Sequence, residues 1–195
     1  MTALRYNTTE KSSSLYKHGN GHLYLHLGAG ETIIPEFINL DIREKNDIDK
    51  ISLVYPLDFD NDIFDLVYSS HVLEHFSRRQ IRNVLQEWTR VLKPGGILRL
   101  SVPSIENLIK IYLKCKDLGQ IIGPLYGGQD YKYNFHYTVF DIDTLVSLME
   151  SVGLDAIHTW DYRRTIHSKY WDYSQAETKG ILISLNIEGR KKLNL

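Results

Sequence analysis

The sequence predicts an α/β fold with one doubly wound, mostly parallel sheet of the Rossmann-like type. Strand-like apolar runs alternate with helical ones, which is typical of parallel strands joined by helices. The first run is followed by a glycine-framed turn and the second ends in a carboxylate, as in sheets that bind nucleotides. With 195 residues, 43% of them hydrophobic, the chain is long enough for one core and short for two.

Residues 1–21 are polar and show no sustained apolar period, so we expect an N-terminal arm there and one folded domain over 22–195. The apolar runs of strand-like length are, in chain order, 23–27, 37–42, 64–69, 97–102, 154–162 and 181–187. These runs are the expected strands.

Two helices are predicted with defined ends. Apolar residues recur at helical spacing over 77–92, where Ser77 is the expected N-cap and Gln80 completes a capping box. Asp141 is the expected N-cap of a second helix, which Gly153 ends.

The turn after the first strand is a candidate ligand site. Gly28 and Gly30 can adopt backbone angles closed to other residues, so main-chain N–H groups can approach a ligand. Asp41, at the end of the next strand, can accept hydrogen bonds from both hydroxyls of a ribose. The alternatives are a plain turn at the glycines and a helix cap or surface charge at Asp41.

The first crossover is short. Eleven positions separate Gly30 from Asp41, with Pro35 between them, whereas a dinucleotide-binding fold leaves about 20 for a full helix. We therefore expect the first helix to be reduced to a turn. Fewer N–H groups at a helix N-terminus would then face an anionic ligand.

Two long motifs follow. Residues 56–76 read PLDFDNDIFDLVYSSHVLEHF, and residues 91–103 read VLKPGGILRLSVP, with a turn expected at 94–96. In these motifs the chain resembles the class I S-adenosylmethionine-dependent methyltransferases, in particular the small, type 11-like branch with an FDxVxxxHVLEH segment and an LKPGG turn. The resemblance covers roughly residues 23–189 and implies a sheet that ends in an antiparallel pair of strands.

The resemblance implies S-adenosylmethionine as the cofactor, bound at the carboxyl ends of the first, second and fourth strands. The residues expected to line it are Gly28, Ala29, Gly30, Asp41, Ile42, Ser52, Leu53, Ser70 and His71. Two features depart from the family pattern. His26 stands where an acidic residue is common, and the acidic residue that often accompanies the adenine is missing near Ser52. We expect modest cofactor affinity.

Methyl transfer is an in-line displacement, so the protein must mainly align the nucleophile and exclude water. For a hydroxyl acceptor, a histidine with a pKa near neutrality is the natural general base. We assign this role to His75 or His136, although each could instead be a structural histidine. The segment 126–136, rich in Tyr, Gly and Asn, is expected to contact a small-molecule or saccharide acceptor, although a merely packed surface loop fits it nearly as well.

The spacing of His71, Glu74 and His75 places them on one face of a helical turn, where they could also hold a metal. The resemblance assigns this turn to the boundary between cofactor and acceptor instead. We therefore expect no metal ligands here.

Two other functions fit parts of the sequence. The chain could be a non-catalytic binding module. In that case, the short crossover and His26 would be traces of a cofactor site that has been lost. An NAD-dependent oxidoreductase would need a Tyr-x-x-x-Lys pair, and Tyr112 and Lys116 have that spacing. They fall on a predicted helix, however, and nothing else follows the dehydrogenase pattern.

Charge and composition narrow the partners. A formal net charge of -1 gives no field to recruit nucleic acid or an anionic membrane, so we expect neither. Cys115 is the single cysteine, which excludes an internal disulfide and fits a reducing compartment. No apolar run approaches the roughly 18 residues of a membrane span, and we expect a cytoplasmic protein. The sequence predicts neither the identity of the acceptor nor the oligomeric state.

Overall fold

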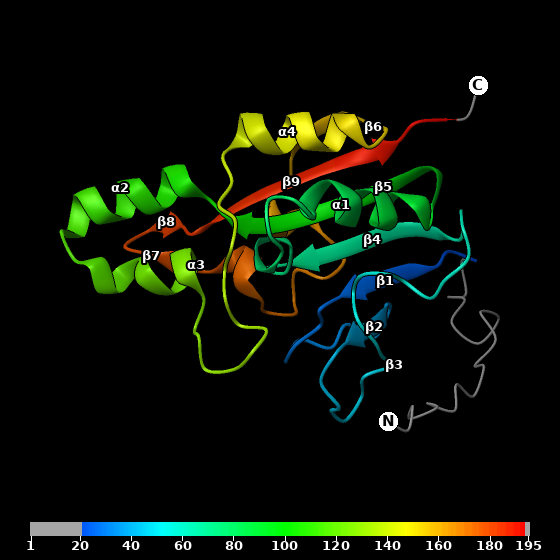
Figure 1. The fold of residues 1–195 in the computed structure, drawn as a ribbon, viewed down its shortest axis with the longest axis horizontal. Coiled ribbons are helices and arrows are strands. Elements are labelled where there is room, and N and C mark those ends of the chain that lie inside the picture. Colours follow the sequence, from blue (N-terminus) through cyan, green and yellow to red (C-terminus); the bar gives the residue numbers. More distant parts are fainter. Residues whose placement is uncertain (1–20, 194–195) are drawn as a thin grey trace.

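A computed structural model describes residues 21–193, so the predicted N-terminal arm lies almost wholly outside the described residues. The central sheet has seven strands in the order β3-β2-β1-β4-β5-β9-β6 (Figure 1). Its strands are β1 (Tyr24–Leu27), β2 (Ile38–Asp41), β3 (Lys50–Ile51), β4 (Phe64–Ser70), β5 (Leu92–Pro103), β6 (Leu154–Thr159) and β9 (Ser184–Lys191). A separate two-stranded sheet joins β7 (Glu177–Thr178) to β8 (Ile181–Leu182).

The strands β1 to β5 pair in parallel, whereas β9 runs antiparallel to both β5 and β6. The predicted Rossmann-like α/β sheet with an antiparallel pair at its C-terminal end is therefore confirmed. The helices are α1 (Ile81–Arg90), α2 (Ile105–Cys115), α3 (Ile122–Tyr126) and α4 (Ile142–Ser151). Short 3-10 turns are η2 (Leu73–His75), η3 (Leu118–Gln120), η4 (Tyr162–Arg164) and η5 (Tyr173–Gln175).

The ends of α4 are as predicted. The Asp141 carboxylate accepts a hydrogen bond from the Thr144 amide at 2.7 Å, and Gly153 has a φ of 93°. By contrast, α1 begins at Ile81, later than the predicted cap. The Ser77 hydroxyl donates to the Gln80 side chain at 2.8 Å, so a turn precedes the helix where a full capping box was expected.

The predicted turn at 94–96 lies inside β5. Leu92 pairs with Phe64 and Ile97 pairs with Leu66, so the residues between Leu92 and Ile97 bulge out of the ladder. Gly95 allows this excursion with a φ of 79°. As a result, β5 begins earlier than the apolar run that predicted it.

The two faces of the sheet are covered differently. Helices α1 and α4 pack on one face (Figure 1), where Trp88 and Met149 are fully buried. No helix joins β1 to β2, which confirms the predicted short crossover. The opposite face, around Tyr68, is covered by the segment 160–176 through Trp160 and Tyr170.

A buried hydrogen bond fixes this cover, because the Tyr68 hydroxyl donates to an Asp172 carboxylate oxygen at 2.5 Å. The long return between β6 and β9 thus takes the place of the missing crossover helix. Within residues 21–193, no helix is long and apolar enough to cross a membrane.

Candidate active site

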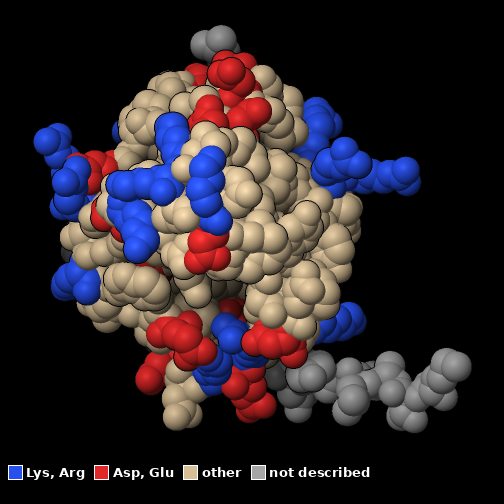
Figure 2. Space-filling view, turned by 90° about the vertical axis from the view of Figure 1, so that its left-hand side faces the viewer, with Lys and Arg blue, Asp and Glu red and all other residues tan. Residues whose placement is uncertain are grey.

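The predicted site residues gather at the carboxyl ends of β1, β2 and β4, which point to the left in Figure 1. Figure 2 views the molecule from that side. It shows a hollow in the lower half of this face, with mostly uncharged residues and a few acidic and basic side chains above it, and a mixed group of acidic and basic side chains below it. This edge of a parallel sheet is where ligands bind in open α/β folds.

The structure joins the glycine turn to the carboxylate at the end of β2. Gly28 has a φ of 66° and Gly30 a φ of 59°, so the chain turns sharply after β1. The Gly30 amide then donates to Asp41 Oδ2 at 2.8 Å. The predicted neighbourhood of turn and carboxylate is thus present in the fold.

The Asp41 carboxylate already has several partners within the chain. Its Oδ1 accepts from the Arg43 amide at 2.8 Å and from Arg43 Nε at 3.2 Å. Together with the Gly30 bond, three of its roughly four acceptor positions are used. A ribose can take the remaining position, and a second hydroxyl has to displace the Arg43 guanidinium.

The other predicted cofactor residues divide by exposure. Ala29 is buried and its amide donates to the Leu40 carbonyl at 3.0 Å, while the Ser52 amide donates to the Asp41 carbonyl at 3.0 Å. Leu53 is 48% exposed, so its side chain offers an open apolar surface. Ile42 and Ser70 are half-buried at the ends of β2 and β4.

A cluster of polar side chains follows β4. His71 has a φ of 54°, which is uncommon for a residue with a side chain and is found at functional sites. The turn η2 then buries the Glu74 side chain completely. No other described residue forms a hydrogen bond to either of its carboxylate oxygens. Burial raises the pKa of Glu74 to about 8.

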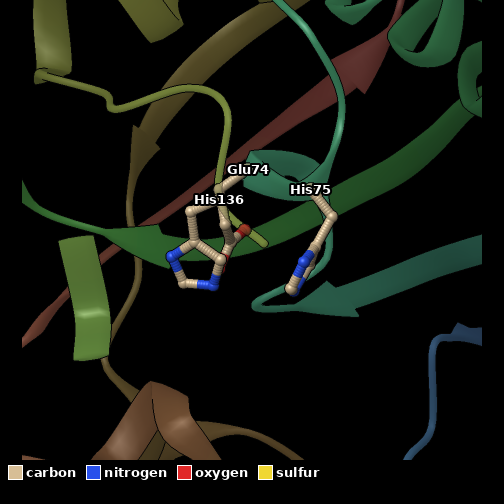
Figure 3. A group of neighbouring side chains, drawn as sticks. All are labelled: Glu74, His75 and His136. Carbon is tan, nitrogen blue, oxygen red and sulfur yellow. The ribbon is translucent and has the colours of Figure 1, made fainter. Parts of the chain in front are cut away.

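Two further histidines face this carboxylate (Figure 3). His75 comes from η2 and His136 from the loop before α4, and their ring centroids are 4.6 Å apart at an interplanar angle of 85°. His136 Nε2 lies 3.9 Å from Glu74 Oε1. The loop is held in place by the Tyr137 amide, which donates to the Glu74 carbonyl at 2.8 Å.

Backbone carbonyls fix the tautomers of both rings. Nδ1 of His75 donates to the Phe135 carbonyl at 3.1 Å, and Nδ1 of His136 donates to the Pro124 carbonyl at 2.8 Å. In a neutral ring, Nε2 is then the acceptor nitrogen. Burial lowers the pKa of His75 to about 4 and lowers that of His136 below its ordinary value. The expected pKa near neutrality is therefore wrong.

His71 lies in the same cluster. The Ser184 hydroxyl donates to the Tyr173 carbonyl at 2.7 Å, so its oxygen accepts a hydrogen bond from His71 Nε2, also at 2.7 Å. His71 Nδ1 lies 3.4 Å from Glu74 Oε1. Burial lowers the pKa of His71 to about 3.

From the sequence, Glu74 is considered only as a metal ligand beside His71 and His75, and that role is not expected. Its spacing from His71 and His75 was visible, but its complete burial depends on the loop that carries His136, which is distant in sequence. The Tyr112 and Lys116 pair lies on the surface of α2, where Tyr112 is 40% exposed.

Part of the chain matches a known protein family. A family model described as a methyltransferase domain matches residues 29–100. The chain thus contains a methyltransferase domain, matched over residues 29–100, and has the fold of class I methyltransferases. The match begins in the glycine turn and ends in β5, so it includes Asp41 and the Glu74 turn. The cofactor of this class is S-adenosylmethionine, and the sequence-based resemblance is confirmed.

Solved methyltransferase structures share the fold. An S-adenosylmethionine-dependent methyltransferase from Thermotoga maritima, described as a possible histamine N-methyltransferase, is 18% identical with a TM-score of 0.56, covering 87% of this chain and 82% of that one. One from Archaeoglobus fulgidus is 16% identical with a TM-score of 0.55, covering 91% and 89%.

A third structure contains a bound product of the cofactor. The 1,6-didemethyltoxoflavin-N1-methyltransferase of Burkholderia thailandensis, solved with S-adenosylhomocysteine, is 15% identical with a TM-score of 0.53, covering 92% of this chain and 76% of that one. Likenesses at these identities show the fold alone. A search of curated proteins finds no match.

The residues of this methyltransferase fit the nucleoside part of the cofactor. A carboxylate lies beside a turn of two glycines with positive φ, and β4 pairs with β1, the strand that leads into this turn. No helix begins at this turn, so no helix N-terminus faces the methionine carboxylate. The turn therefore offers an anionic ligand fewer backbone N–H groups than a long crossover helix provides.

Substituting Asp41 tests the ribose contact. We expect Asp41→Ala to weaken binding of S-adenosylhomocysteine by about 1.5 to 3 kcal/mol, because a hydrogen bond to a charged group is lost. Calorimetric titration measures the change. Arg43→Ala is the matched control, because it removes the Nε bond to Asp41 Oδ1, keeps the bond from the residue 43 amide, and should preserve or raise the affinity. Equal affinity of Asp41→Ala and the unmodified protein would show that the ribose is held elsewhere.

The pKa of Glu74 predicts how stability depends on pH. The folded pKa of about 8 exceeds the ordinary 4.5, so the folded state keeps a proton that the unfolded chain releases. This contribution to the free energy of unfolding is complete below about pH 4.5 and is lost as pH rises to 8, by on the order of 4 kcal/mol. Glu74→Gln should remove this loss.

Chemical denaturation between pH 5 and 9, in the presence of a chelator, measures the difference between the two proteins. The facing groups His71, His75 and His136 are present in both, so their own titration cancels to first order. Parallel stability curves for the two proteins would contradict the assignment of the proton to Glu74.

Proposed function

We propose that this methyltransferase transfers a methyl group to a hydroxyl of a small molecule or a saccharide. The bound cofactor supplies an electrophilic methyl group on a sulfonium. In the transfer, the bond from the acceptor oxygen to the methyl carbon forms, the carbon–sulfur bond breaks with its electron pair going to sulfur, and the hydroxyl proton leaves.

The observation that carries this proposal is the pair of oriented imidazoles. His75 and His136 each keep their Nδ1 proton on a backbone carbonyl, so each Nε2 presents a lone pair. A hydroxyl, unlike a neutral amine, must lose its proton as it is methylated, so it gains most from such a group. Nε2 of His75 or of His136 is the proposed acceptor of that proton.

The surroundings favour an amphipathic acceptor. Exposed tyrosines follow the loop that carries His136, and rings with polar tips suit the faces of sugars. These residues are Tyr126, Tyr131, Tyr133 and Tyr137, each at least 40% exposed. The Arg43 guanidinium lies 5.8 Å from the ring centroid of Tyr131, so this loop reaches the Asp41 end of the site.

An acceptor screen tests the proposal. The full chain is incubated with methyl-labelled S-adenosylmethionine and panels of monosaccharides, phenols and primary amines, and label incorporation is counted. We expect incorporation into hydroxyl acceptors. Labelling confined to the amines would overturn the choice of oxygen as the acceptor atom. Amines are included because one of the similar solved structures is described as a possible histamine N-methyltransferase.

We also propose that the enzyme acts in the cytoplasm on a free small molecule, without nucleic acid or a membrane as partner. The single cysteine, Cys115, and the near-neutral net charge of -1 support this assignment.

A further inference from the structure

We propose that Glu74, His75 and His136 form a binding site for one divalent transition-metal cation. Each residue offers one ligand atom, and the three atoms all lie within 4.8 Å of one another. Figure 3 shows the two rings turned to the same side, from η2 and from the loop before α4. The Thr138 hydroxyl ties this loop to η2 by donating to the Phe76 carbonyl at 2.8 Å.

The burial of Glu74 is an independent indication of a ligand. Its side chain is fully buried, and no other described residue forms a hydrogen bond to either carboxylate oxygen. A buried carboxylate without partners is costly, so proteins rarely keep one. A cation bound at this point supplies the missing partner.

Both imidazoles are already oriented as metal ligands are. In metal sites, the second ring nitrogen usually donates to a carbonyl or carboxylate, which fixes the tautomer and the ring. His75 and His136 each donate from Nδ1 to a backbone carbonyl, which leaves Nε2 for the cation.

The distances need only a small adjustment. Ligand atoms of a cation with bonds of about 2.1 Å lie roughly 3 to 3.5 Å apart. Glu74 Oε1 and His136 Nε2 are 3.9 Å apart. The three ligand atoms all lie within 4.8 Å of one another, so binding draws them together toward the cation.

The donor set selects the kind of cation. Two imidazole nitrogens and one carboxylate oxygen suit Zn²⁺, Mn²⁺, Co²⁺ or Fe²⁺, whereas Mg²⁺ and Ca²⁺ prefer oxygen ligands throughout. Three protein ligands leave further positions open, as in catalytic metal sites. The acceptor hydroxyl can occupy one of them.

The catalytic part of this inference rests on the proposed function. A hydroxyl bound to a divalent cation loses its proton at a lower pH, so water can take the proton. In this form of the reaction, His75 and His136 hold the cation and do not accept the proton themselves. The cation site itself stands independently of the acceptor.

Metal titration of the full chain tests the site. After treatment with EDTA and its removal, we expect one equivalent of Zn²⁺ or Mn²⁺ to bind in calorimetry, and bound Co²⁺ to show a visible absorption spectrum. Glu74→Gln and His136→Ala should each weaken binding by about tenfold or more and change that spectrum. His158→Ala is the control, because this histidine is 60% exposed and pairs with Glu188 outside the cluster.

Absence of binding, or binding that survives both cluster variants when circular dichroism shows them folded, overturns the site. Methyl transfer to a hydroxyl that continues unchanged in EDTA overturns the catalytic role of the cation and leaves the proposed function intact. Cation binding by a protein that methylates only amines supports the site and overturns the proposed function.

Discussion

Replacement of Gly28 by valine is expected to abolish binding of S-adenosylhomocysteine. Gly28 has a φ of 66°, a conformation that costs other residues about 1–2 kcal/mol. A Cβ at this position would lie 2.4 Å from Val72 Cγ2, so the glycine turn would also have to move away from the start of η2. Calorimetry on the purified variant measures the loss, and affinity equal to that of the unmodified protein would contradict it.

A second variant separates loss of the cofactor site from a packing defect. Val72→Ala removes the atom that the new Cβ would meet, so the double variant Gly28→Ala with Val72→Ala should recover the part of the thermal stability that the contact with Val72 costs Gly28→Ala, while the cost of the positive φ remains. We expect its affinity for S-adenosylhomocysteine to remain reduced. Full recovery of affinity would show that Gly28 serves only the contact with Val72.

Loss of the imidazole at position 75 or 136 is expected to lower turnover by about 100- to 10,000-fold. In the proposed function these rings act on the acceptor and not on the cofactor, so S-adenosylhomocysteine affinity should stay nearly unchanged. Turnover is measured with the hydroxyl acceptor that the screen identifies. The reason for the effect is the oriented Nε2 lone pair of each ring, which alanine removes.

His158→Ala is again the matched control, because its ring is exposed and lies outside the cluster. Turnover close to that of the unmodified enzyme in both cluster variants would show that neither imidazole activates the acceptor. A nitrogen or sulfur nucleophile would then be favoured over a hydroxyl.

Sequence reasoning worked best where the signal was local or periodic. The Asp141 cap and the apolar runs fixed most element positions, because caps and periodicity act over a few residues. The short crossover followed from a simple count of positions. Local signals did not predict the start of β5. The bulge between Leu92 and Ile97 is set by pairing with Phe64 and Leu66, which lie on another strand.

The candidate site was predictable only in part, for the same reason. The glycine turn and Asp41 are close in sequence, and the structure joins them by a hydrogen bond. The environment of the histidines depends on distant chain segments. Burial by these segments determines the lowered pKa of His75 and the complete burial of Glu74, which no local spacing reveals.

The cover formed by segment 160–176 has a consequence for how the chain folds. The bond between Tyr68 and Asp172 spans 104 positions, and the Thr32 hydroxyl reaches the Trp171 carbonyl across 139 positions. Such long loops close late, because their entropy must be lost before any contact compensates for it. During synthesis, one face of β1 and β4 therefore stays open until almost the whole chain has been made. The Thr32 end of the first crossover gains its bond to Trp171 only at that stage, whereas the glycine turn is held earlier by its bond to Asp41.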